Sequence, residues 1–369
     1  MRGLRSHASA GFSALGILVR SFGLDLANLG LVLQALHFAP LVVQMTELEQ
    51  AEENLQSLLW ELDAHVERRA PSQAWPRLTA SVTTCWLAIQ ELEEDEIYGA
   101  SAAWRSRFHP WFLQAPCIRR AYEKPLGYAG DFGVMDLGYR NIPEAETPMG
   151  NLLHGWFSTA LRGSTAVRAR RRWIGLEMQR HAARSMGLWR GMSLASGSSW
   201  ELRDMVHESW LIHRANMTCV DQDPRALAAA EEGLREAETK HGRTLDAIFL
   251  RQSVREVIRG GLGDLPKQDF VYSLGLYDYL PKVPAQLLTT VLARQLRPGG
   301  RLIVGNYLVG HDTQPVLELV MDWFLIGRSP EQIEDLVSDL GRDYSARVQI
   351  DSTGSIGFLV VDFASVTSA

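Results

Sequence analysis

Small polar residues form a loop between an apolar run, Met192 to Ala195, and a predicted helix that begins near Trp200. The loop is Ser196-Gly197-Ser198-Ser199. Such a loop presents backbone N–H groups and a helix N-terminus to a ligand, and its small side chains let the ligand approach the backbone closely. It suits a nucleotide-like cofactor, although one Gly in a Ser-rich turn is a weak signal by itself.

An acidic residue follows at the position of a ribose-binding carboxylate. Thr218 to Asp221 predicts the next strand, and Asp221 lies 24 residues after Gly197. A carboxylate at this strand end can accept hydrogen bonds from both ribose hydroxyls. Asp223, which precedes Pro224, is better suited to cap the following helix.

The third predicted strand, Ala247 to Leu250, brings Gln252 and Ser253 to the same edge of the sheet. Either side chain could bind the edge of an adenine ring, and either could instead cap the helix that begins near Val254. Both interpretations stay open.

The elements that position these residues are clearest from Asp269 to Tyr307. A short apolar run, Phe270 to Leu276, predicts a strand buried on both faces, and Ala285 to Leu296 has apolar residues at helical spacing. Pro298-Gly299-Gly300 is expected to end that helix and turn the chain into a second buried strand, Arg301 to Gly305. This pattern predicts a parallel-sheet crossover in an α/β fold.

Length and composition limit the class of protein. The 369 residues leave room for an α/β unit of about 180 residues and a separate domain. The chain is 46% hydrophobic and 22% charged, which is typical of a soluble protein. Its net charge of −6 argues against nucleic-acid binding. We expect a small-molecule substrate and a cytoplasmic location, with a homodimer left open.

The cysteines and histidines predict no metal site. Cys85, Cys117 and Cys219 form no CxxC pair and lie near no His at ligand spacing, so we expect buried free thiols. The ten His include no HExxH motif.

Residues 1–46 differ from the rest of the chain, because Asp25 is the only acid before Glu47 and no charge occurs between Leu26 and Thr46. The window is long enough for a membrane span but carries several polar residues and a Pro. Two interpretations stay open. The protein starts at Met45 and the upstream residues are a mis-called extension, or they form a genuine membrane or export segment.

Residues 47–186 predict a helical N-terminal domain, and residues 187–369 predict the cofactor-binding domain. Two helices, Thr46 to Glu67 and Arg77 to Glu94, are expected before a loop with closely spaced turn-formers and Tyr, Ala121 to Asp131.

A long helix is expected from Asn151 to Met186, with a break near Gly163. It carries five arginines, for which a solvated face is the commoner meaning and a carboxylate or phosphate clamp is the alternative. They are Arg162, Arg168, Arg170, Arg171 and Arg172.

The first loop, the acid after the second strand and the Pro-Gly-Gly turn before a late strand together resemble class I S-adenosylmethionine-dependent methyltransferases. The resemblance covers about Leu188 to Phe363 and implies a Rossmann-like sheet that binds S-adenosylmethionine. Nicotinamide enzymes would normally show a fuller GxGxxG and lack the Pro-Gly-Gly turn. In the first loop this chain departs from the pattern, since Ser193 stands for the usual acid, Ala195 for the first Gly and Ser199 for the last. The contacts to the methionine part of the cofactor are thereby left unassigned.

A narrower resemblance reaches into the helical region. Four segments look like the bacterial family named for the biosynthesis of 3-hydroxypalmitic acid methyl ester: Lys124 to Asp131, Gly275 to Leu280, Val304 to Tyr307, and Asp322-Trp323. This resemblance implies methyl transfer to a carboxylate of a fatty acid or natural product. Tyr277 stands where that family usually has Phe.

Aromatic faces can hold a sulfonium by cation–π attraction, and the candidates are Tyr122, Tyr128, Tyr277, Tyr279 and Tyr307. Asn306, after a buried strand, either orients a substrate or caps a turn. We predict catalytic contacts for Tyr128, Tyr277, Asn306 and Tyr307. The predicted cofactor contacts are Tyr122, Ala195, Ser196, Gly197, Asp221, Gln222, Gln252, Ser253, Ser273 and Leu274.

Two other functions remain open from the sequence. Some proteins that resemble this fold close a ring within S-adenosylmethionine to give azetidine-2-carboxylate and methylthioadenosine, and the Tyr277 hydroxyl could orient the attacking amine. A non-catalytic binding protein with a decayed first loop is the third interpretation, against which Gly197 and Asp221 argue.

Overall fold

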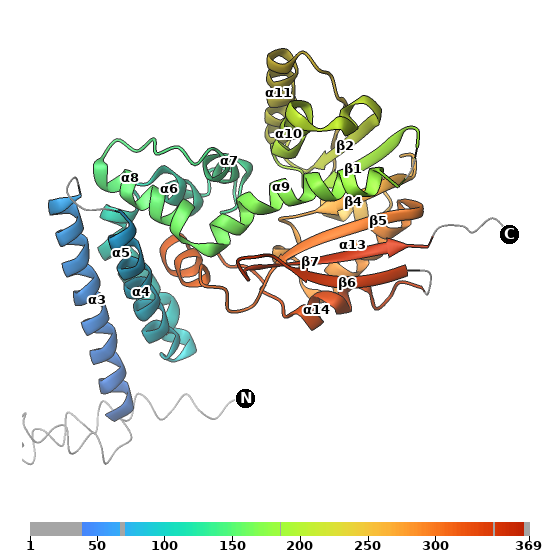
Figure 1. The fold of residues 1–369 in the computed structure, drawn as a ribbon. Coiled ribbons are helices and arrows are strands. Elements are labelled where there is room, and N and C mark those ends of the chain that lie inside the picture. The colour runs from blue at the N-terminus through green and yellow to red at the C-terminus, as the bar shows by residue number, and fades with distance from the viewer. Residues whose placement is uncertain (1–38, 67–70, 185, 342–343, 365–369) are drawn as a thin grey trace, which may run out of the picture.

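The computed structural model describes residues 39–66, 71–184, 186–341 and 344–364. Most of the predicted extension, residues 1–38, lies outside the described residues. The described chain has a group of helices at one end and a sheet covered by helices at the other (Figure 1).

The sheet has seven strands in the order β3-β2-β1-β4-β5-β7-β6. β1 to β5 pair in parallel, and β7 pairs antiparallel with both β5 and β6. This is the strand arrangement of the class I methyltransferase sheet, and it confirms the predicted fold class. The strands are β1 (Trp189–Leu194), β2 (Ala215–Asp221), β3 (Asp246–Arg251), β4 (Gln268–Ser273), β5 (Leu296–Tyr307), β6 (Tyr344–Ile350) and β7 (Ile356–Phe363).

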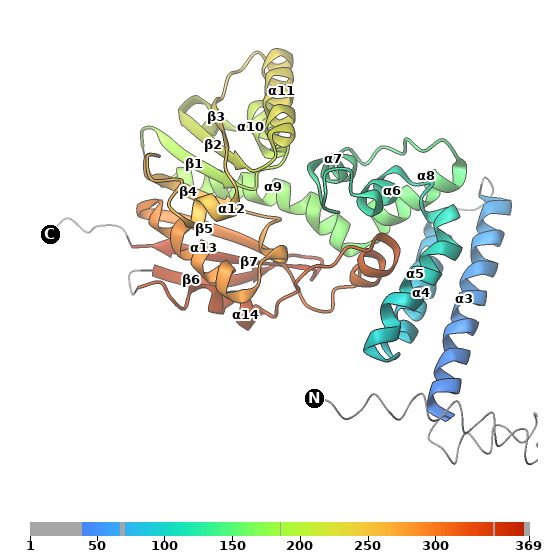
Figure 2. The same ribbon diagram turned by 180° about the vertical axis from the view of Figure 1, so that it is seen from behind.

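Helices cover both faces of the sheet (Figures 1 and 2). On one face the apolar core joins β1, β2 and β4 to α9, α10, η2 and α11. On the other it joins the central strands to α12, α13, α14 and η5. These elements are α9 (Arg162–Ala182), α10 (Trp200–Glu208), η2 (Trp210–Arg214), α11 (Pro224–His241), α12 (Val254–Ile258), α13 (Lys282–Arg294), α14 (Pro330–Glu334) and η5 (Asp335–Val337).

The third core lies among the N-terminal helices and includes the fully buried Trp104 and Trp156. A segment from between β5 and β6, the π-helix η4 (Val316–Val320), is part of this same core. The other elements of the helical region are α3 (Ala39–His65), α4 (Pro71–Gln90), α5 (Glu94–Phe112), α6 (Pro116–Glu123), α7 (Phe132–Arg140), α8 (Pro148–Gly155) and the π-helix η1 (Trp156–Ala160).

Several boundaries differ from those predicted. α3 begins at Ala39, ahead of the predicted start at Thr46. The predicted break near Gly163 is confirmed, because Leu161 is extended between η1 and α9. The Pro-Gly-Gly turn differs most. α13 ends at Arg294, and Pro298 to Gly300 lie inside β5, in an irregular stretch where Leu296 pairs with Gln268 and Arg301 with Phe270.

The three cysteines are free and buried, as predicted. No helix within the described ranges is long and apolar enough to cross a membrane. In the same part of the chain, no group of three or more His, Cys, Asp or Glu is placed to hold a metal ion.

Candidate active-site cavity

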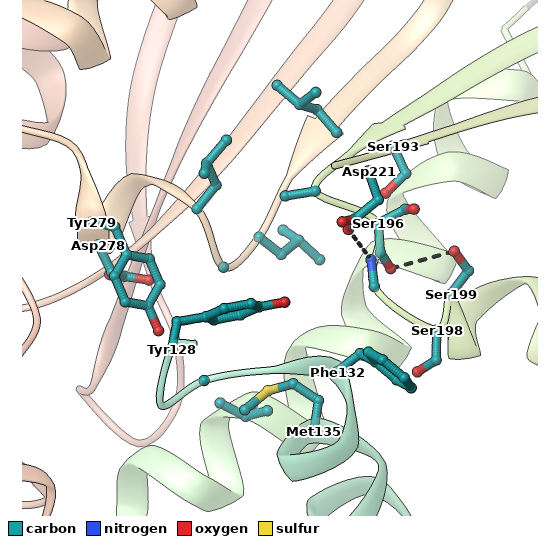
Figure 3. Close-up of a pocket in the computed structure, with 18 of the residues that line it drawn as sticks. Tyr128, Phe132, Met135, Ser193, Ser196, Ser198, Ser199, Asp221, Asp278 and Tyr279 are labelled. Carbon is teal, nitrogen blue, oxygen red and sulfur yellow. Dashed lines mark hydrogen bonds between the residues drawn. The ribbon is translucent and has the colours of Figure 1, made fainter. Parts of the chain in front are cut away.

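A cavity of about 500 Å³ lies at the carboxyl ends of β1, β2, β4 and β5. Binding crevices form at this edge of parallel sheets because the loops that leave the strands meet there. Residues of α7, α9 and the loop between α6 and α7 also line it. Figure 3 shows this loop carrying Tyr128 across from Ser196 and Asp221.

The loop after β1 has an unusual backbone. Ala195, Gly197 and Ser199 have φ values of +54°, +55° and +47°, so the chain is left-handed at each of the three positions where the class I pattern has Gly. This conformation costs an L-residue other than Gly about 1 kcal/mol in conformational free energy. The loop leads into α10 at Trp200, and the hydroxyl oxygen of Ser196 is buried beside the cavity without a hydrogen-bond partner.

Asp221 ends β2 and faces the loop. Its Oδ2 accepts a hydrogen bond from Gly197 N at 2.8 Å, and its Oδ1 accepts one from Asp223 N at 2.9 Å. Burial raises the pKa of Asp221, and the two N–H donors oppose that rise. Each carboxylate oxygen keeps a second lone pair for a ligand hydroxyl. Asp223 is the N-cap of α11 and accepts a hydrogen bond from Arg225 N, so its predicted capping role is confirmed.

Of the two candidate residues after β3, only Gln252 lies at the cavity. Gln252 lines the cavity, its amide group donates to Gly261 O, and its Oε1 is buried without a partner. Ser253 does not line the cavity and forms a capping box with Glu256, so the capping alternative holds for Ser253. Gln222 lines the cavity beside Asp221.

The chain after β4 contributes backbone atoms to the cavity wall. Leu274 lines the cavity, and its carbonyl oxygen accepts a hydrogen bond from Arg170 Nη1 at 2.6 Å. Ser273 lies deeper, is fully buried and donates its hydroxyl to Leu194 O at 2.9 Å. The Ser273 side chain therefore links β4 to β1 and is not part of the cavity lining.

The loop from Lys124 to Asp131, here called the roof loop, is held at both ends. Lys124 Nζ donates to Asp322 O at 2.7 Å and to Asp322 Oδ2 at 2.8 Å. At the other end Asp131 pairs with Arg120 at 2.8 Å and caps α7. These contacts fix the loop that carries Tyr128 over the cavity.

Aromatic side chains line the end of the cavity under the roof loop. Burial, with nearby Asp221, raises the pKa of Tyr128 to about 12, so its hydroxyl stays protonated at neutral pH. Tyr279 accepts a hydrogen bond from Trp323 Nε1 at 2.9 Å, and Tyr307 donates to Gly163 O at 3.1 Å. Tyr128, Tyr279, Tyr307 and Trp323 all line the cavity.

Three charged cavity residues were not among the predicted contacts. Arg170, on α9, is buried, and its Nε has no hydrogen-bond partner. Asp278 accepts a hydrogen bond from Tyr307 N at 2.6 Å, and burial raises its pKa to about 6. Glu201, on α10, accepts a hydrogen bond from Tyr272. Sequence signals existed for two of the three, because Arg170 belongs to the arginine run and Asp278 to the segment Gly275 to Leu280.

The solvated-face interpretation of that run is wrong for Arg170, which lines the cavity at 7% exposure. It holds for Arg172, which is exposed. Arg171 makes a two-pronged ion pair with Asp204, at 2.6 and 2.8 Å. Arg170, Arg171 and Arg172 therefore have different environments.

Several predicted contacts lie away from the cavity. Tyr277 is fully buried in the core beneath α13, and its hydroxyl bonds to Thr289 at 3.1 Å. Asn306 donates to Tyr307 O and Ile326 O, at 2.8 and 2.9 Å. Tyr122 packs edge-on against His109. The predicted residues that do meet at the cavity are Tyr128, Ala195, Ser196, Gly197, Asp221, Gln222, Gln252, Leu274 and Tyr307.

The strand order and the site at the strand ends define a Rossmann-like α/β protein of the class I methyltransferase fold. No known protein family matches the chain, and no curated protein matches it. Among solved structures it is similar to a possible exported protein from Bordetella parapertussis, with 16% identity and a TM-score of 0.52, over 81% of this chain and 98% of that one. This similarity concerns the fold alone.

Two methyltransferases are also similar, at lower scores. Magnesium protoporphyrin IX methyltransferase from Synechocystis PCC 6803, with bound SAH, has 15% identity and a TM-score of 0.41, over 55% of this chain and 86% of that one. The N-methyltransferase NodS from Bradyrhizobium japonicum WM9, in complex with S-adenosyl-L-homocysteine, has 11% identity and a TM-score of 0.35, over 52% and 86%.

Proposed function

We propose that this protein binds S-adenosylmethionine in the cavity and transfers its methyl group to a small-molecule carboxylate, from a fatty acid or another natural product. The first loop is the observation that carries the proposal. Ala195 and Ser199 are left-handed despite their side chains, and Gly197 N donates to Asp221. The loop thus keeps the backbone shape of a glycine-rich cofactor loop without two of its glycines.

The unsatisfied polar atoms fit such a cofactor. Ser196 Oγ and Gln252 Oε1 are buried beside the cavity without partners, and a buried polar atom without a hydrogen bond costs about 1 to 3 kcal/mol. A nucleoside offers hydroxyl and amino groups that can bond to them. Asp221 would bind the ribose hydroxyls, and Gln252 would bind the adenine edge.

The side chains have mainly to bind, orient and exclude water. Bound S-adenosylmethionine supplies a methyl group already activated on a sulfonium. The aromatic side chains under the roof loop offer faces that attract such a cation. The roof loop covers the cavity and limits access of water. A carboxylate acceptor has no proton to lose, so no general base is needed.

The other functions have less support. For ring closure the Tyr277 hydroxyl was a candidate to orient the attacking amine, but it is buried against Thr289 and does not reach the cavity. The non-catalytic interpretation relied on a decayed loop, whereas the left-handed backbone is retained at all three positions.

Product analysis tests the proposal. The protein is incubated with S-adenosylmethionine alone and then with a panel of acyl and amino-acid carboxylates, and all products are identified by mass spectrometry. We expect S-adenosylhomocysteine and one methyl ester, formed only when an acceptor is present. Methylthioadenosine formed together with azetidine-2-carboxylate in the absence of an acceptor would contradict methyl transfer and favour ring closure.

A further inference from the structure

Ser193 leaves the site without the negative charge that the class I pattern has at this position. It is the penultimate residue of β1, lines the cavity, is 3% exposed, and stands where the class I pattern has an acid. A hydroxyl carries no charge to balance a ligand ammonium. A carboxylate from elsewhere in the fold could supply that charge if it reaches the same wall of the cavity.

Glu201 meets this condition. It lies in the first turn of α10 and lines the cavity. Its Oε1 accepts a hydrogen bond at 2.8 Å from the hydroxyl of Tyr272, which is 1% exposed. Tyr272 and Ser193 are paired neighbours on β4 and β1. The tyrosine therefore fixes the carboxylate at the same cavity that Ser193 lines.

A positive charge faces the same cavity from the neighbouring helix. The Arg170 guanidinium is anchored through Nη1 to Leu274 O, while its Nε has no partner. Arg170 and Glu201 come from α9 and α10, which pack on the same face of the sheet. Asp221 and Asp278 also line the cavity, but Glu201 and Arg170 come from adjacent helices, and together they complement a group that carries both charges.

We infer that Arg170 and Glu201 bind the α-amino-acid end of S-adenosylmethionine as a zwitterion, with Glu201 on the ammonium in place of the acid missing at Ser193. The inference rests on the proposed function. Burial raises the pKa of Glu201, and an arriving ammonium offsets that cost. Tyr272 is a positioning residue, since it acts through Glu201.

Three ligands separate the two charges. S-adenosylmethionine has both the ammonium and the carboxylate, decarboxylated S-adenosylmethionine keeps only the ammonium, and 5′-methylthioadenosine has neither. Dissociation constants are measured by calorimetry for the wild type, Glu201→Gln and Arg170→Gln. Glu208→Gln and Arg172→Gln are matched controls, because both residues are exposed on the same two helices.

Glu201→Gln is expected to weaken binding of the first two ligands by about tenfold or more and to leave methylthioadenosine within about twofold, because a charged hydrogen bond is lost. Arg170→Gln is expected to weaken S-adenosylmethionine alone. Tyr272→Phe should repeat the Glu201→Gln pattern to a smaller extent, which gives a second reading if Glu201→Gln folds poorly. Ser193→Asp in the Glu201→Gln background should restore affinity.

Equal losses for all three ligands in Glu201→Gln would show that the Glu201–Tyr272 pair only braces the fold, and would overturn the inference. Unchanged affinity for S-adenosylmethionine in that variant would overturn it as well. If the wild type binds none of the three ligands, the proposed function itself fails, and with it the inference.

Discussion

At the scale of single residues, the first loop holds two side chains in a backbone conformation that disfavours them. Ala195→Gly and Ser199→Gly should each raise the free energy of unfolding by about 1 kcal/mol, because Gly adopts a positive φ without steric cost. Urea unfolding measures the change. Ser196→Gly is the matched control, since Ser196 is not left-handed, and it should lower stability.

Asp278 predicts a pH dependence of stability. Its pKa in the folded protein is about 6, above the ordinary 3.8, so the folded state binds this proton more tightly than the unfolded state does. The stabilisation is complete below about pH 4 and is lost as the pH rises through 6.

Asp278→Asn removes this dependence. Between pH 4 and 7 the wild type should lose up to about 3 kcal/mol more stability than the variant. Other buried acids titrate in both proteins and cancel in the difference. Parallel stability curves for the two proteins would show that burial does not perturb this carboxyl.

The sequence pattern located Asp221 and Gln252, which follow strand ends, but did not locate Glu201, which reaches the cavity from a helix. Asp221 and Gln252 are fixed in place by local chain order, which a strand-and-loop pattern captures. Glu201 and Asp278 depend on contacts with Tyr272 and Tyr307, which are distant in the sequence. Tyr277 begins a short 3₁₀ turn, Tyr277–Tyr279, which places Tyr277 in the core and Asp278 and Tyr279 at the cavity.

At the scale of elements, the roof loop depends on close packing at Gly130. A Cβ there would lie 2.5 Å from Trp323 Cζ2 and closer still to the Tyr279 hydroxyl. Gly130→Ala should therefore lower the free energy of unfolding by about 1 to 3 kcal/mol through overpacking and weaken ligand binding.

Gly138→Ala is the matched control for this element. Gly138 lies on α7, which follows the roof loop, and a Cβ there meets nothing within 4 Å. This substitution should raise stability by about 0.5 to 1 kcal/mol, since Ala favours a helix over Gly. Thermal and urea unfolding of the Gly130→Ala and Gly138→Ala variants measure the two changes. Equal stabilities of the two variants would contradict the close packing at Gly130.

The parallel strands were predictable because each is a short apolar run followed by a polar residue. The Pro-Gly-Gly segment was not, since a sequence pattern cannot separate a turn before a strand from an irregular stretch inside one. In β5 that stretch is fixed on both sides, because Leu296 pairs with Gln268 and Gly299 N donates to Ala364 O.

At the scale of the whole molecule, the helical region and the sheet are linked by a segment that leaves the sheet after β5 and packs among the N-terminal helices. η4 follows β5 in the chain but packs with Trp104 and Trp156 in the helical core. Unfolding of the helical core should therefore disturb the sheet. Urea transitions followed by tryptophan fluorescence and by far-UV circular dichroism should coincide.

Two separated transitions would instead indicate independently stable units. The return of η4 could not be foreseen, because residues 308–328 have no pattern that assigns them to either region.

The central claim is that the cavity at the strand ends binds S-adenosylmethionine through the first loop and Asp221. Calorimetric titration with S-adenosylhomocysteine tests it most directly, on the wild type and on Asp221→Ala. We predict one site with a dissociation constant on the order of micromolar, and a loss of at least about tenfold in the variant, because charge-assisted hydrogen bonds disappear. No detectable binding to the wild type, or equal binding to both proteins, would contradict the claim.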